Sequence, residues 1–161
     1  MTARDGSEAL HPELGIPGLL RLARRPYRNA VRAAFAEAGF DDVPRNGAYL
    51  LARVYDGRYS VADLTRGLGI SKQAVSQLVD TMVTRGYIER KPDAEDRRRM
   101  QLTLTARGAA AATLSWQAAT RTDEELERRL SAAGVAALRS GLIALSEMGE
   151  EDPLPADPDA D

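Results

Sequence analysis

The sequence predicts a mainly α-helical protein with one small β-hairpin, and three observations support this fold class. Apolar residues recur at helical spacing over most of the chain between residues 19 and 148. The alternation of apolar and polar residues that is typical of a strand occurs in Met-Gln-Leu-Thr-Leu at residues 100–104. Glycines stand where the helical patterns stop, at Gly39, Gly57, Gly69 and Gly86.

The first two helices are expected at residues 19–38 and 44–55. The first helix has an apolar stripe that ends at Gly39 and consists of Leu20, Ala23, Tyr27, Val31, Ala34 and Ala38. Pro26 interrupts this pattern, so it either kinks the helix or marks its true first turn. Pro44 can open the second helix, because proline fits the first helical turn. The inner face of this helix is expected to hold Ala48, Leu51, Ala52 and Tyr55.

A short helix and a longer one follow, each with its own start signal. Ser60 begins Ser-Val-Ala-Asp, which resembles a capping box with Asp63 in place of the usual Glu or Gln. Ser71 is the next N-cap, and Gly86 ends the second helix of this pair. The apolar face of that helix consists of Ala74, Val75, Leu78, Val79, Met82 and Val83. Its opposite, polar face consists of Lys72, Gln73, Ser76, Gln77, Asp80, Thr81 and Thr84.

The rest of the chain is expected to form a hairpin and two further helices. Residues 87–91 and 99–104 are predicted strands joined by a charged loop at 92–98, and Met100, Leu102 and Leu104 share one strand face. Thr105 caps a long, alanine-rich helix that runs to about residue 130, and Ser131 caps a last helix. The apolar stripe of the last helix consists of Val135, Leu138, Leu142, Leu145 and Met148.

This order of elements predicts a winged helix-turn-helix. A short helix, a tight glycine turn, a second amphipathic helix and a hairpin are the parts of that fold, and their apolar faces build its small core. The polar face of residues 71–85 is left outward, and the charged hairpin stands beside it. The loop at 92–98 is then the wing.

Composition excludes several classes of function. The 161 residues suffice for one domain, and cysteine is absent, which removes disulfides, thiolate catalysis and cysteine metal sites. The only histidine, His11, has no partner for a metal site or a catalytic pair, and the sequence motifs of hydrolases, dinucleotide-binding proteins and P-loop proteins are missing. Adjacent carboxylates such as Glu124 and Glu125 are interpreted as solvated charge. We therefore expect a protein without cofactor or metal that is not an enzyme.

Neither a membrane span nor a secretory signal is expected. No uninterrupted apolar run approaches about 20 residues, and the N-terminus lacks a basic start followed by an apolar stretch. The expected location is the cytoplasm.

Charge is unevenly distributed along the chain. The formal net charge is −2, from 22 basic and 24 acidic residues. Residues 149–161, called the acidic tail below, contain six acidic residues and no basic ones, so the remainder has 22 basic and 18 acidic residues, a net of +4. Between Arg85 and Arg107 there are seven basic and four acidic residues. A surface that faces phosphates has such a positive field.

Residues 68–108 resemble the MarR family of bacterial winged-helix regulators. The resemblance rests on Gly-Tyr-Ile-Glu-Arg at 86–90, the Asp-x-Arg pattern at 96–98 and the Leu-Thr-x-x-Gly pattern at 104–108. The order of helices is similar from about residue 19 to residue 148. The family implies a homodimer in which the N-terminal helix and the last two helices of both subunits interlock. Each subunit then offers one recognition helix to a major groove of double-stranded DNA and one wing to a flanking minor groove.

The resemblance also implies which side chains contact DNA. On the recognition helix these are Ser71, Lys72, Gln73, Ser76, Gln77 and Thr81. Lysine and glutamine suit base edges, while the two serines and Thr81 can equally serve phosphates. On the wing, Arg98 takes the second position of Asp-x-Arg and enters the minor groove, and Asp96 orients it through an ion pair. Arg97 and Arg99 are equally open to phosphate contact and to plain solvation.

Three further residues have open alternatives. Asp80 is acidic on the side that faces DNA, so an ion pair on the helix surface or with the hairpin suits it better than a DNA contact. Many family members have an effector pocket between the dimer helices and the winged domain, which Tyr49 and Trp116 are candidates to line. Packing in the core is the more frequent role of such aromatic residues.

Together these features predict a dimeric, sequence-specific DNA-binding transcriptional regulator, more often a repressor in this family, with a small-molecule effector in many members. The expected division is a flexible leader at 1–17, a winged domain with dimerisation helices at 18–148 whose DNA-binding core is about 44–108, and a disordered acidic tail. The tail is expected to compete with DNA for the basic surface. The alternative is a winged-helix module that binds protein, which predicts an apolar patch where Lys72, Gln73 and Gln77 stand.

Overall fold

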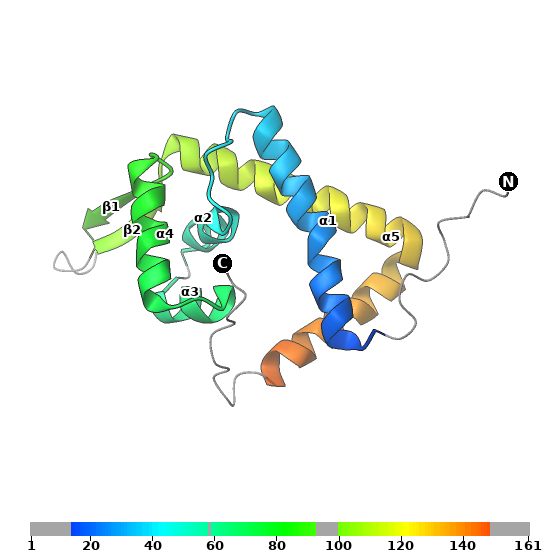
Figure 1. The fold of residues 1–161 in the computed structure, drawn as a ribbon. Helices are drawn as coiled ribbons and strands as arrows, with labels where there is room; N and C mark the ends of the chain where they lie inside the picture. The colour runs from blue at the N-terminus through cyan, green and yellow to red at the C-terminus, as the bar shows by residue number, and fades with distance from the viewer. Residues whose placement is uncertain (1–13, 58, 93–99, 149–161) are drawn as a thin grey trace, which may run out of the picture.

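The computed structural model describes residues 14–57, 59–92 and 100–148. Five helices and two strands follow one another in the predicted order (Figure 1). They are α1 (Ile16–Glu37), α2 (Gly47–Tyr55), α3 (Val61–Leu68), α4 (Lys72–Thr84), β1 (Ile88–Pro92), β2 (Met100–Leu104) and α5 (Ala106–Met148). The predicted fold class, a mainly helical winged helix-turn-helix with one hairpin, is confirmed.

The core lies between α2, α3, α4, the hairpin and the first turns of α5. Its buried members are Phe35, Leu50, Leu51, Val54, Leu64, Val75, Val79, Met82, Tyr87, Ile88, Ala111 and Ala112. On α4 the predicted apolar face is the face that is buried, since Val75, Val79 and Met82 are inside and its other members are half-buried. The polar face of α4 therefore points away from the core.

Helix α1 starts earlier than expected. It begins at Ile16, with Pro17 in its first turn, and runs through Pro26 to Glu37. Of the two alternatives for Pro26, the one that made it the first turn is therefore wrong. Pro26 lacks an N–H, so the carbonyl of Leu22 has no donor four residues ahead, and this position of the helix is exposed to water. Gly39 follows the helix with φ of +75°, the left-handed conformation expected of a terminating glycine.

Helix α2 starts three residues later than the sequence predicted. Pro44 lies in a turn, in which its carbonyl accepts a hydrogen bond from the Gly47 N–H at 2.8 Å, and the helix begins at Gly47. The predicted inner face was also wrong for Ala52 and Tyr55, which are exposed, Tyr55 by 71%. Leu51 is buried as predicted, and Leu50 and Val54, which were not predicted, are buried with it. Apolar residues surround most of this helix, so their spacing alone did not select the face.

The start signals of α3 and α4 are confirmed. The Ser60 hydroxyl accepts from the Asp63 N–H at 3.0 Å, and the Asp63 carboxylate accepts from the Ser60 N–H at 3.2 Å, which completes the capping box. The Ser71 hydroxyl accepts from the Ala74 N–H at 3.2 Å. Between the two helices Gly69 has φ of +67°, which closes the tight turn that sets α4 across α3.

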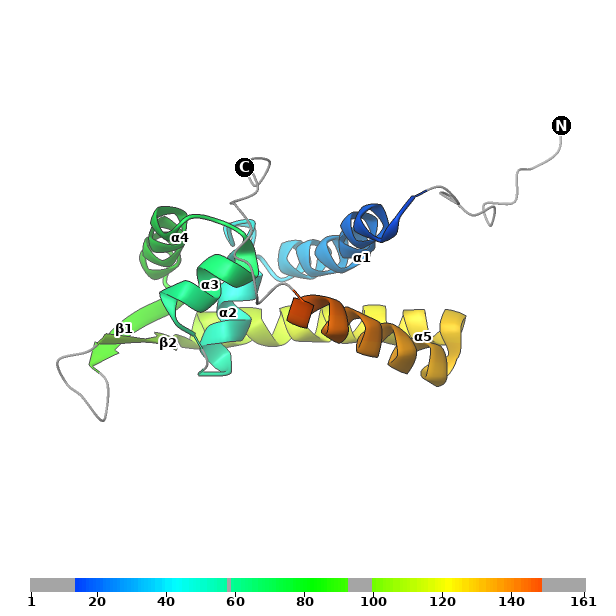
Figure 2. The ribbon, with the colours of Figure 1, turned by 90° about the horizontal axis from the view of Figure 1, so that it is seen from below.

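The hairpin is antiparallel, with Ile88 opposite Leu104 at its base and Pro92 opposite Met100 at its far end. The strands agree with the predicted 87–91 and 99–104 to within one residue at each end. Ile88 is buried, whereas Met100 is 59% exposed, because the hairpin extends beyond the core (Figure 2). Of the loop that the sequence assigns to the wing, at 92–98, Pro92 ends β1 and the rest lies outside the described residues.

Helix α5 is two helices, as predicted, that join at Ser131. Thr105 caps the first, since its hydroxyl accepts from the Gly108 N–H at 3.0 Å. Ser131 has φ of 67° and ψ of 163°, values no helix allows, and its hydroxyl accepts from the Gly134 N–H at 3.4 Å. The second half of α5 therefore turns back along the molecule (Figure 1).

Helix α1 packs against α5 along most of its length (Figures 1 and 2), and Phe35 near its C-terminal end joins the winged core. The Tyr27 hydroxyl donates to Asp123 at 2.5 Å, and this hydrogen bond raises the pKa of Tyr27 to about 12. Beyond Ser131 no side chain of α5 is buried in this chain. Of its predicted apolar stripe, Val135 is half-buried, and Leu138, Leu142, Leu145 and Met148 are exposed.

By length and composition one stretch of α5 is apolar enough to cross a membrane, which the sequence analysis did not expect. A single helix of this kind is weak evidence for a membrane span. An apolar helix face that packs against another protein surface has the same composition.

Candidate nucleic-acid interface

The α4 polar face, with its N-cap Ser71, is the first part of the candidate interface. Ser71, Lys72, Gln73, Ser76 and Gln77 are exposed, and Thr81 is half-buried further along the helix. The hydroxyl of Ser76 donates to the Lys72 carbonyl at 3.1 Å, and that of Thr81 donates to the Gln77 carbonyl at 2.8 Å. Both hydroxyls keep lone pairs for a further donor.

The long side chains at the start of α4 are available for contacts with another molecule. Lys72, Gln73 and Gln77 make no side-chain hydrogen bond or ion pair with any residue that the structure describes. They lie within the first two turns, where unpaired backbone N–H groups and the helix dipole favour negative charge. A lysine ammonium and two carboxamides at this end can bind both phosphates and base edges.

An ion pair joins α4 to the hairpin. Arg90 on β1 donates to the Asp80 carboxylate at 2.5 Å. Of the two ion pairs that the sequence left open for Asp80, on the helix surface or with the hairpin, the structure has the second. The pair neutralises the one acidic side chain of the α4 polar face and links α4 to β1. Because both side chains are largely exposed, its contribution to stability is about 0–1 kcal/mol.

The predicted wing residues Asp96, Arg97, Arg98 and Arg99 lie outside the described residues. The strands that carry the loop are described, and they end at Pro92 and Met100, at the tip of the hairpin away from the core.

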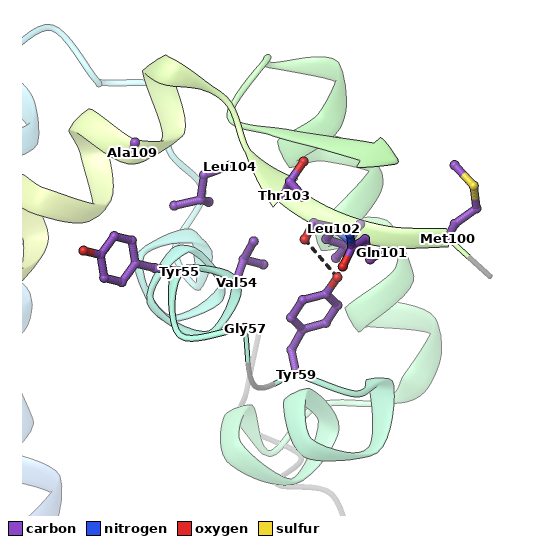
Figure 3. Close-up of a pocket in the computed structure, with 10 residues that line it drawn as sticks. All are labelled: Val54, Tyr55, Gly57, Tyr59, Met100, Gln101, Leu102, Thr103, Leu104 and Ala109. Carbon is purple, nitrogen blue, oxygen red and sulfur yellow. Dashed lines mark hydrogen bonds between the residues drawn. The ribbon is translucent and has the colours of Figure 1, made fainter. Parts of the chain in front are cut away.

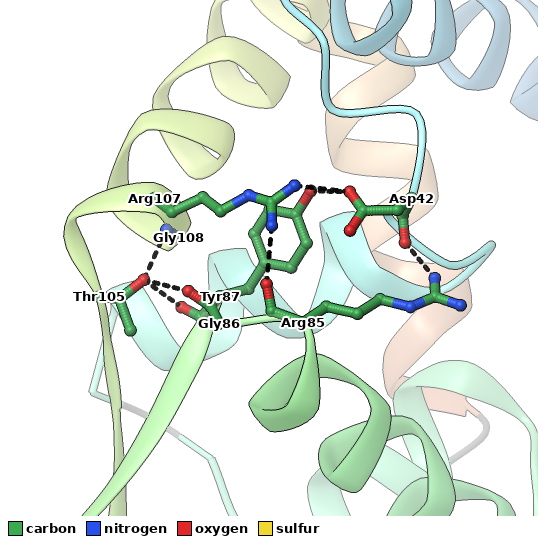
Figure 4. Close-up of polar contacts among 7 residues, drawn as sticks. All are labelled: Asp42, Arg85, Gly86, Tyr87, Thr105, Arg107 and Gly108. Carbon is green, nitrogen blue, oxygen red and sulfur yellow. Dashed lines mark hydrogen bonds and ion pairs between the residues drawn. The ribbon is translucent and has the colours of Figure 1, made fainter.

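A polar network that the sequence analysis missed holds the C-terminal end of α4 (Figure 4). The Asp42 carboxylate accepts from the Tyr87 hydroxyl at 2.5 Å and from the Arg107 guanidinium at 2.8 Å, and the Asp42 carbonyl accepts from Arg85. Arg107 also donates to the Arg85 carbonyl at 2.8 Å and lies over the Tyr87 ring, with its Cζ 4.4 Å from the ring centre. One network thus joins the α1–α2 connection, the end of α4 and the start of α5.

The pKa values of the network follow from these contacts. The hydrogen bond from Tyr87, with the positive charge of Arg107, holds the pKa of Asp42 below its ordinary value. Burial, together with the hydrogen bond to Asp42, raises the pKa of Tyr87 to about 12. At neutral pH the network therefore consists of a carboxylate, a neutral phenol and guanidinium ions. In the sequence, the only sign of this network is that Asp42, Tyr87 and Arg107 each stand close to the start or end of a helix or strand.

An open cavity of about 590 Å³ lies between the end of α2, the turn after it, β2 and the start of α5 (Figure 3). The Tyr59 hydroxyl crosses its floor and donates to the Leu102 carbonyl at 2.9 Å. Neither Tyr49 nor Trp116 lines this cavity. Trp116 is 68% exposed on α5, so it does not pack in the core of this chain, and the Tyr49 hydroxyl lies against Gly67 on α3.

Residues 41–99 match a family model described as MarR family, a segment that spans α2, α3, α4 and the hairpin. This segment is therefore similar to the MarR family. Its fold recurs in solved structures of MarR-family regulators. The crystal structure of reduced MarR from Escherichia coli is 22% identical, with a TM-score of 0.62, and the match covers 82% of this chain and 96% of that one. No curated protein matches the chain.

Two other structures are similar over comparable lengths. A structure named as MarR is 21% identical, with a TM-score of 0.69, and the match covers 89% of this chain and 96% of that one. The Mycobacterium tuberculosis MarR family protein Rv2887, in complex with p-aminosalicylic acid, is 23% identical with a TM-score of 0.60, and coverage is 83% and 99%. These likenesses show that the MarR fold extends over α1 and α5.

The Leu-Thr-x-x-Gly pattern at 104–108, which follows the matched segment, has a structural cause. The Thr105 hydroxyl donates to the Gly86 carbonyl at 2.6 Å while it caps α5. A Cβ atom added to Gly108 would lie 1.9 Å from the Tyr87 carbonyl oxygen, so only glycine allows α5 to approach β1 this closely. These residues hold α5 against the end of α4 and do not themselves face the candidate interface.

Proposed function

We propose that the protein is a homodimeric, sequence-specific DNA-binding transcriptional regulator that acts as a repressor in the cytoplasm and has no enzymatic activity. The observation that carries this proposal is the α4 polar face. It leaves Lys72, Gln73 and Gln77 exposed and without partners among the described residues, beside a hairpin that is fixed to the same helix by Asp80 and Arg90. A protein-binding module would need an exposed apolar patch at these positions. The exposed residues there are polar instead.

In this proposal α4 enters a major groove with its N-terminal turns foremost. Lys72, Gln73 and Gln77 read base edges, because their donors and acceptors match those of guanine and adenine. Ser71, Ser76 and Thr81 hold phosphates, which fixes the register of the helix on the duplex.

The hairpin places its connecting loop in the adjacent minor groove. Arg98 enters the groove, Asp96 orients it, and Arg97 binds a phosphate. A guanidinium in a narrow minor groove responds to the groove's width and negative potential, so the wing reads DNA shape more than base identity.

Two copies assemble through α1 and α5. In each copy these helices stand before and after the DNA-binding core, at about 44–108, in the sequence. Support comes from the apolar side chains that each chain leaves exposed there, among them Leu19 and Leu22 on α1 and Leu138 and Leu142 on α5. A two-fold dimer pairs two α4 helices with half-sites about one helical turn apart, which implies a pseudo-palindromic operator.

We also propose that the protein binds a small-molecule effector. Support comes from the likeness to Rv2887, whose structure contains p-aminosalicylic acid. In the dimer, Tyr49 and Trp116 are the candidates to line the effector site, because both are exposed in the single chain. Since Trp116 is the only tryptophan, its fluorescence reports the event directly. Titration with p-aminosalicylic acid is expected to quench it in the wild type and to release bound DNA.

The proposal is tested by gel shift with the DNA upstream of the protein's own coding sequence. Gln73→Ala is expected to relax the preference at one base position of each half-site by about 1–3 kcal/mol, with an unchanged salt dependence. Arg98→Ala is expected to weaken binding to all sequences and to lower the slope of log affinity against log salt by about one. Thr84→Ala, at the far end of the α4 polar face, is the control. Wild-type protein that binds upstream and random DNA equally would refute sequence-specific recognition.

A further inference from the structure

Helix α1 carries a row of arginines that the DNA-binding proposal leaves without a role. They are Arg21, Arg24, Arg25, Arg28 and Arg32, and all five are exposed. At 3.6 residues per turn, four of them, Arg21, Arg25, Arg28 and Arg32, fall within about 60° of arc and form a stripe about 17 Å long. These four are called the arginine stripe below.

The arginine stripe is exposed and lies to one side of the face of α1 that packs on α5. Tyr27, which reaches Asp123, Val31 and Ala34 belong to that shielded face. Phe35 is the most buried residue of α1 and lies closest to the stripe around the helix, yet the four arginines remain exposed.

None of the five arginines of α1 has an ion-pair partner within the described part of the chain. Arginines elsewhere in the described chain do form ion pairs with carboxylates, namely Arg90, Arg107, Arg128 and Arg129. The only acidic residue of α1 is Glu37, in its last turn. A helix with five arginines and one distant carboxylate is a concentrated positive surface, and a polyanion is the complementary partner.

The acidic tail has matching charge and sufficient reach. It contains six carboxylates in 13 residues and no basic residue, against five arginines on α1. It continues directly from Met148, the end of α5, which turns back and ends between α3 and α1, away from the hairpin (Figures 1 and 2). Thirteen extended residues span up to roughly 45 Å, longer than the whole stripe.

We propose that the acidic tail of each chain docks on the arginine stripe of its own α1. Guanidinium groups bind carboxylates through paired, charge-assisted hydrogen bonds, which favours arginine over lysine in such a surface. A tethered tail has an effective concentration in the millimolar range, so weak individual pairs suffice. The α4 polar face is a poorer site for the tail, because Lys72 is its only cation and Asp80 is also there. This proposal does not depend on DNA binding.

The absence of cysteine allows a direct test. Ala160→Cys places a single thiol in the tail of the full-length protein for a nitroxide label, which broadens backbone amide signals near it. At low salt we expect a loss of amide intensity along α1 between Arg21 and Arg32, with little change along α4. At about 1 M salt, where the Debye length is only about 3 Å, the loss should disappear.

A matched pair of variants tests the side chains. Replacing Arg21, Arg25, Arg28 and Arg32 by glutamine should abolish the broadening of α1, and glutamine keeps the helix propensity. The control replaces four exposed arginines of α5 by glutamine, namely Arg121, Arg128, Arg129 and Arg139, and should leave the broadening intact. In mixed dimers of labelled and isotope-enriched chains, no broadening should pass between chains.

Three outcomes would overturn the proposal. They are broadening centred on α4, no broadening of any helix at low salt, and broadening of α1 that survives the loss of the arginine stripe. Broadening that passes between chains would overturn the assignment to the same chain. None of these readouts depends on DNA, so failure here leaves the DNA-binding proposal standing.

Discussion

The winged core and the second half of α5 differ in what they do with their apolar residues. In the core, Leu50, Leu51 and Met82 have no exposed surface, because α2, α3, α4 and the hairpin enclose one another. Beyond Ser131, α5 has an equally regular apolar stripe, yet Leu138 and Leu142 remain 42% and 41% exposed. One region thus completes its core within the chain, and the other leaves its apolar stripe exposed. Helical periodicity alone does not distinguish these situations.

The largest effect is expected from mutations that put charge on this open surface. Leu138→Glu with Leu142→Glu should convert the protein to a monomer in sedimentation experiments, because two carboxylates would be buried without partners in a dimer interface. DNA affinity should fall by about 10²- to 10⁴-fold, the usual gain from bivalent binding.

The control for this change uses the opposite face of the same helix. Ser140→Glu with Ala144→Glu has the same number and spacing of new charges, and should leave the dimer intact. A double mutant of Leu138 and Leu142 that remains a dimer at micromolar concentration would contradict the assignment of this surface.

The next effect tests the close contact between α5 and the winged core. Gly108→Ala places a methyl group 1.9 Å from the Tyr87 carbonyl oxygen, so backbone must move. We expect a loss of unfolding free energy of about 1–3 kcal/mol or more, as for other overpacked sites.

Gly141→Ala, beyond the kink of the same helix, provides the control. A Cβ atom there meets nothing within 4 Å, so the change should raise stability by up to about 1 kcal/mol. Chemical denaturation measures both variants. Equal effects of the two substitutions would show that α5 does not approach β1 as closely as described.

A smaller effect is expected at the network that joins α4 to α5. The pKa of Asp42 in the folded protein lies below its ordinary value of 3.8, because Tyr87 and Arg107 stabilise the carboxylate. A lowered pKa contributes stability above the ordinary value and loses it as pH falls through the folded-state pKa. Asp42→Asn should therefore be less stable than the wild type at pH 7, and the difference should shrink below about pH 4. A difference between the two unfolding free energies that is constant from pH 7 to pH 3 would exclude this mechanism.

The smallest effect is expected at the exposed pair between α4 and the hairpin. Asp80→Ala removes the ion pair with Arg90 and should cost about 0–1 kcal/mol of stability, less at high salt. The same change removes a negative charge from the α4 polar face, so DNA affinity should rise at low salt. A fall in DNA affinity would mean that Arg90 has to be held by Asp80 for binding.

Sequence reasoning predicted α4 well because several independent signals agree there. Ser71 caps its start, Gly86 ends it with φ of +71°, and Val75, Val79 and Met82 follow a single helical stripe. It predicted α2 less well. There apolar residues surround most of the helix, and Pro44, a common first-turn residue, proved to lie in a turn before it.

The candidate interface could be predicted in part. The exposed side chains of α4 are those that lie opposite its apolar stripe, so periodicity located them. The network of Asp42, Tyr87 and Arg107 could not be predicted. Tyr87 and Arg107 lie 45 and 65 residues after Asp42 along the chain, and only packing brings them together.

By itself the sequence determined the order of the elements, their caps and the polar face of α4. These depend on interactions between residues within a few positions of each other, namely N-cap hydroxyls, left-handed glycines and the helical period. Only the tertiary structure decided which apolar stripe is enclosed and which remains open. It also decided that Trp116 and the arginines of α1 are exposed. Burial is a property of all the elements that surround a residue, and no local pattern contains it.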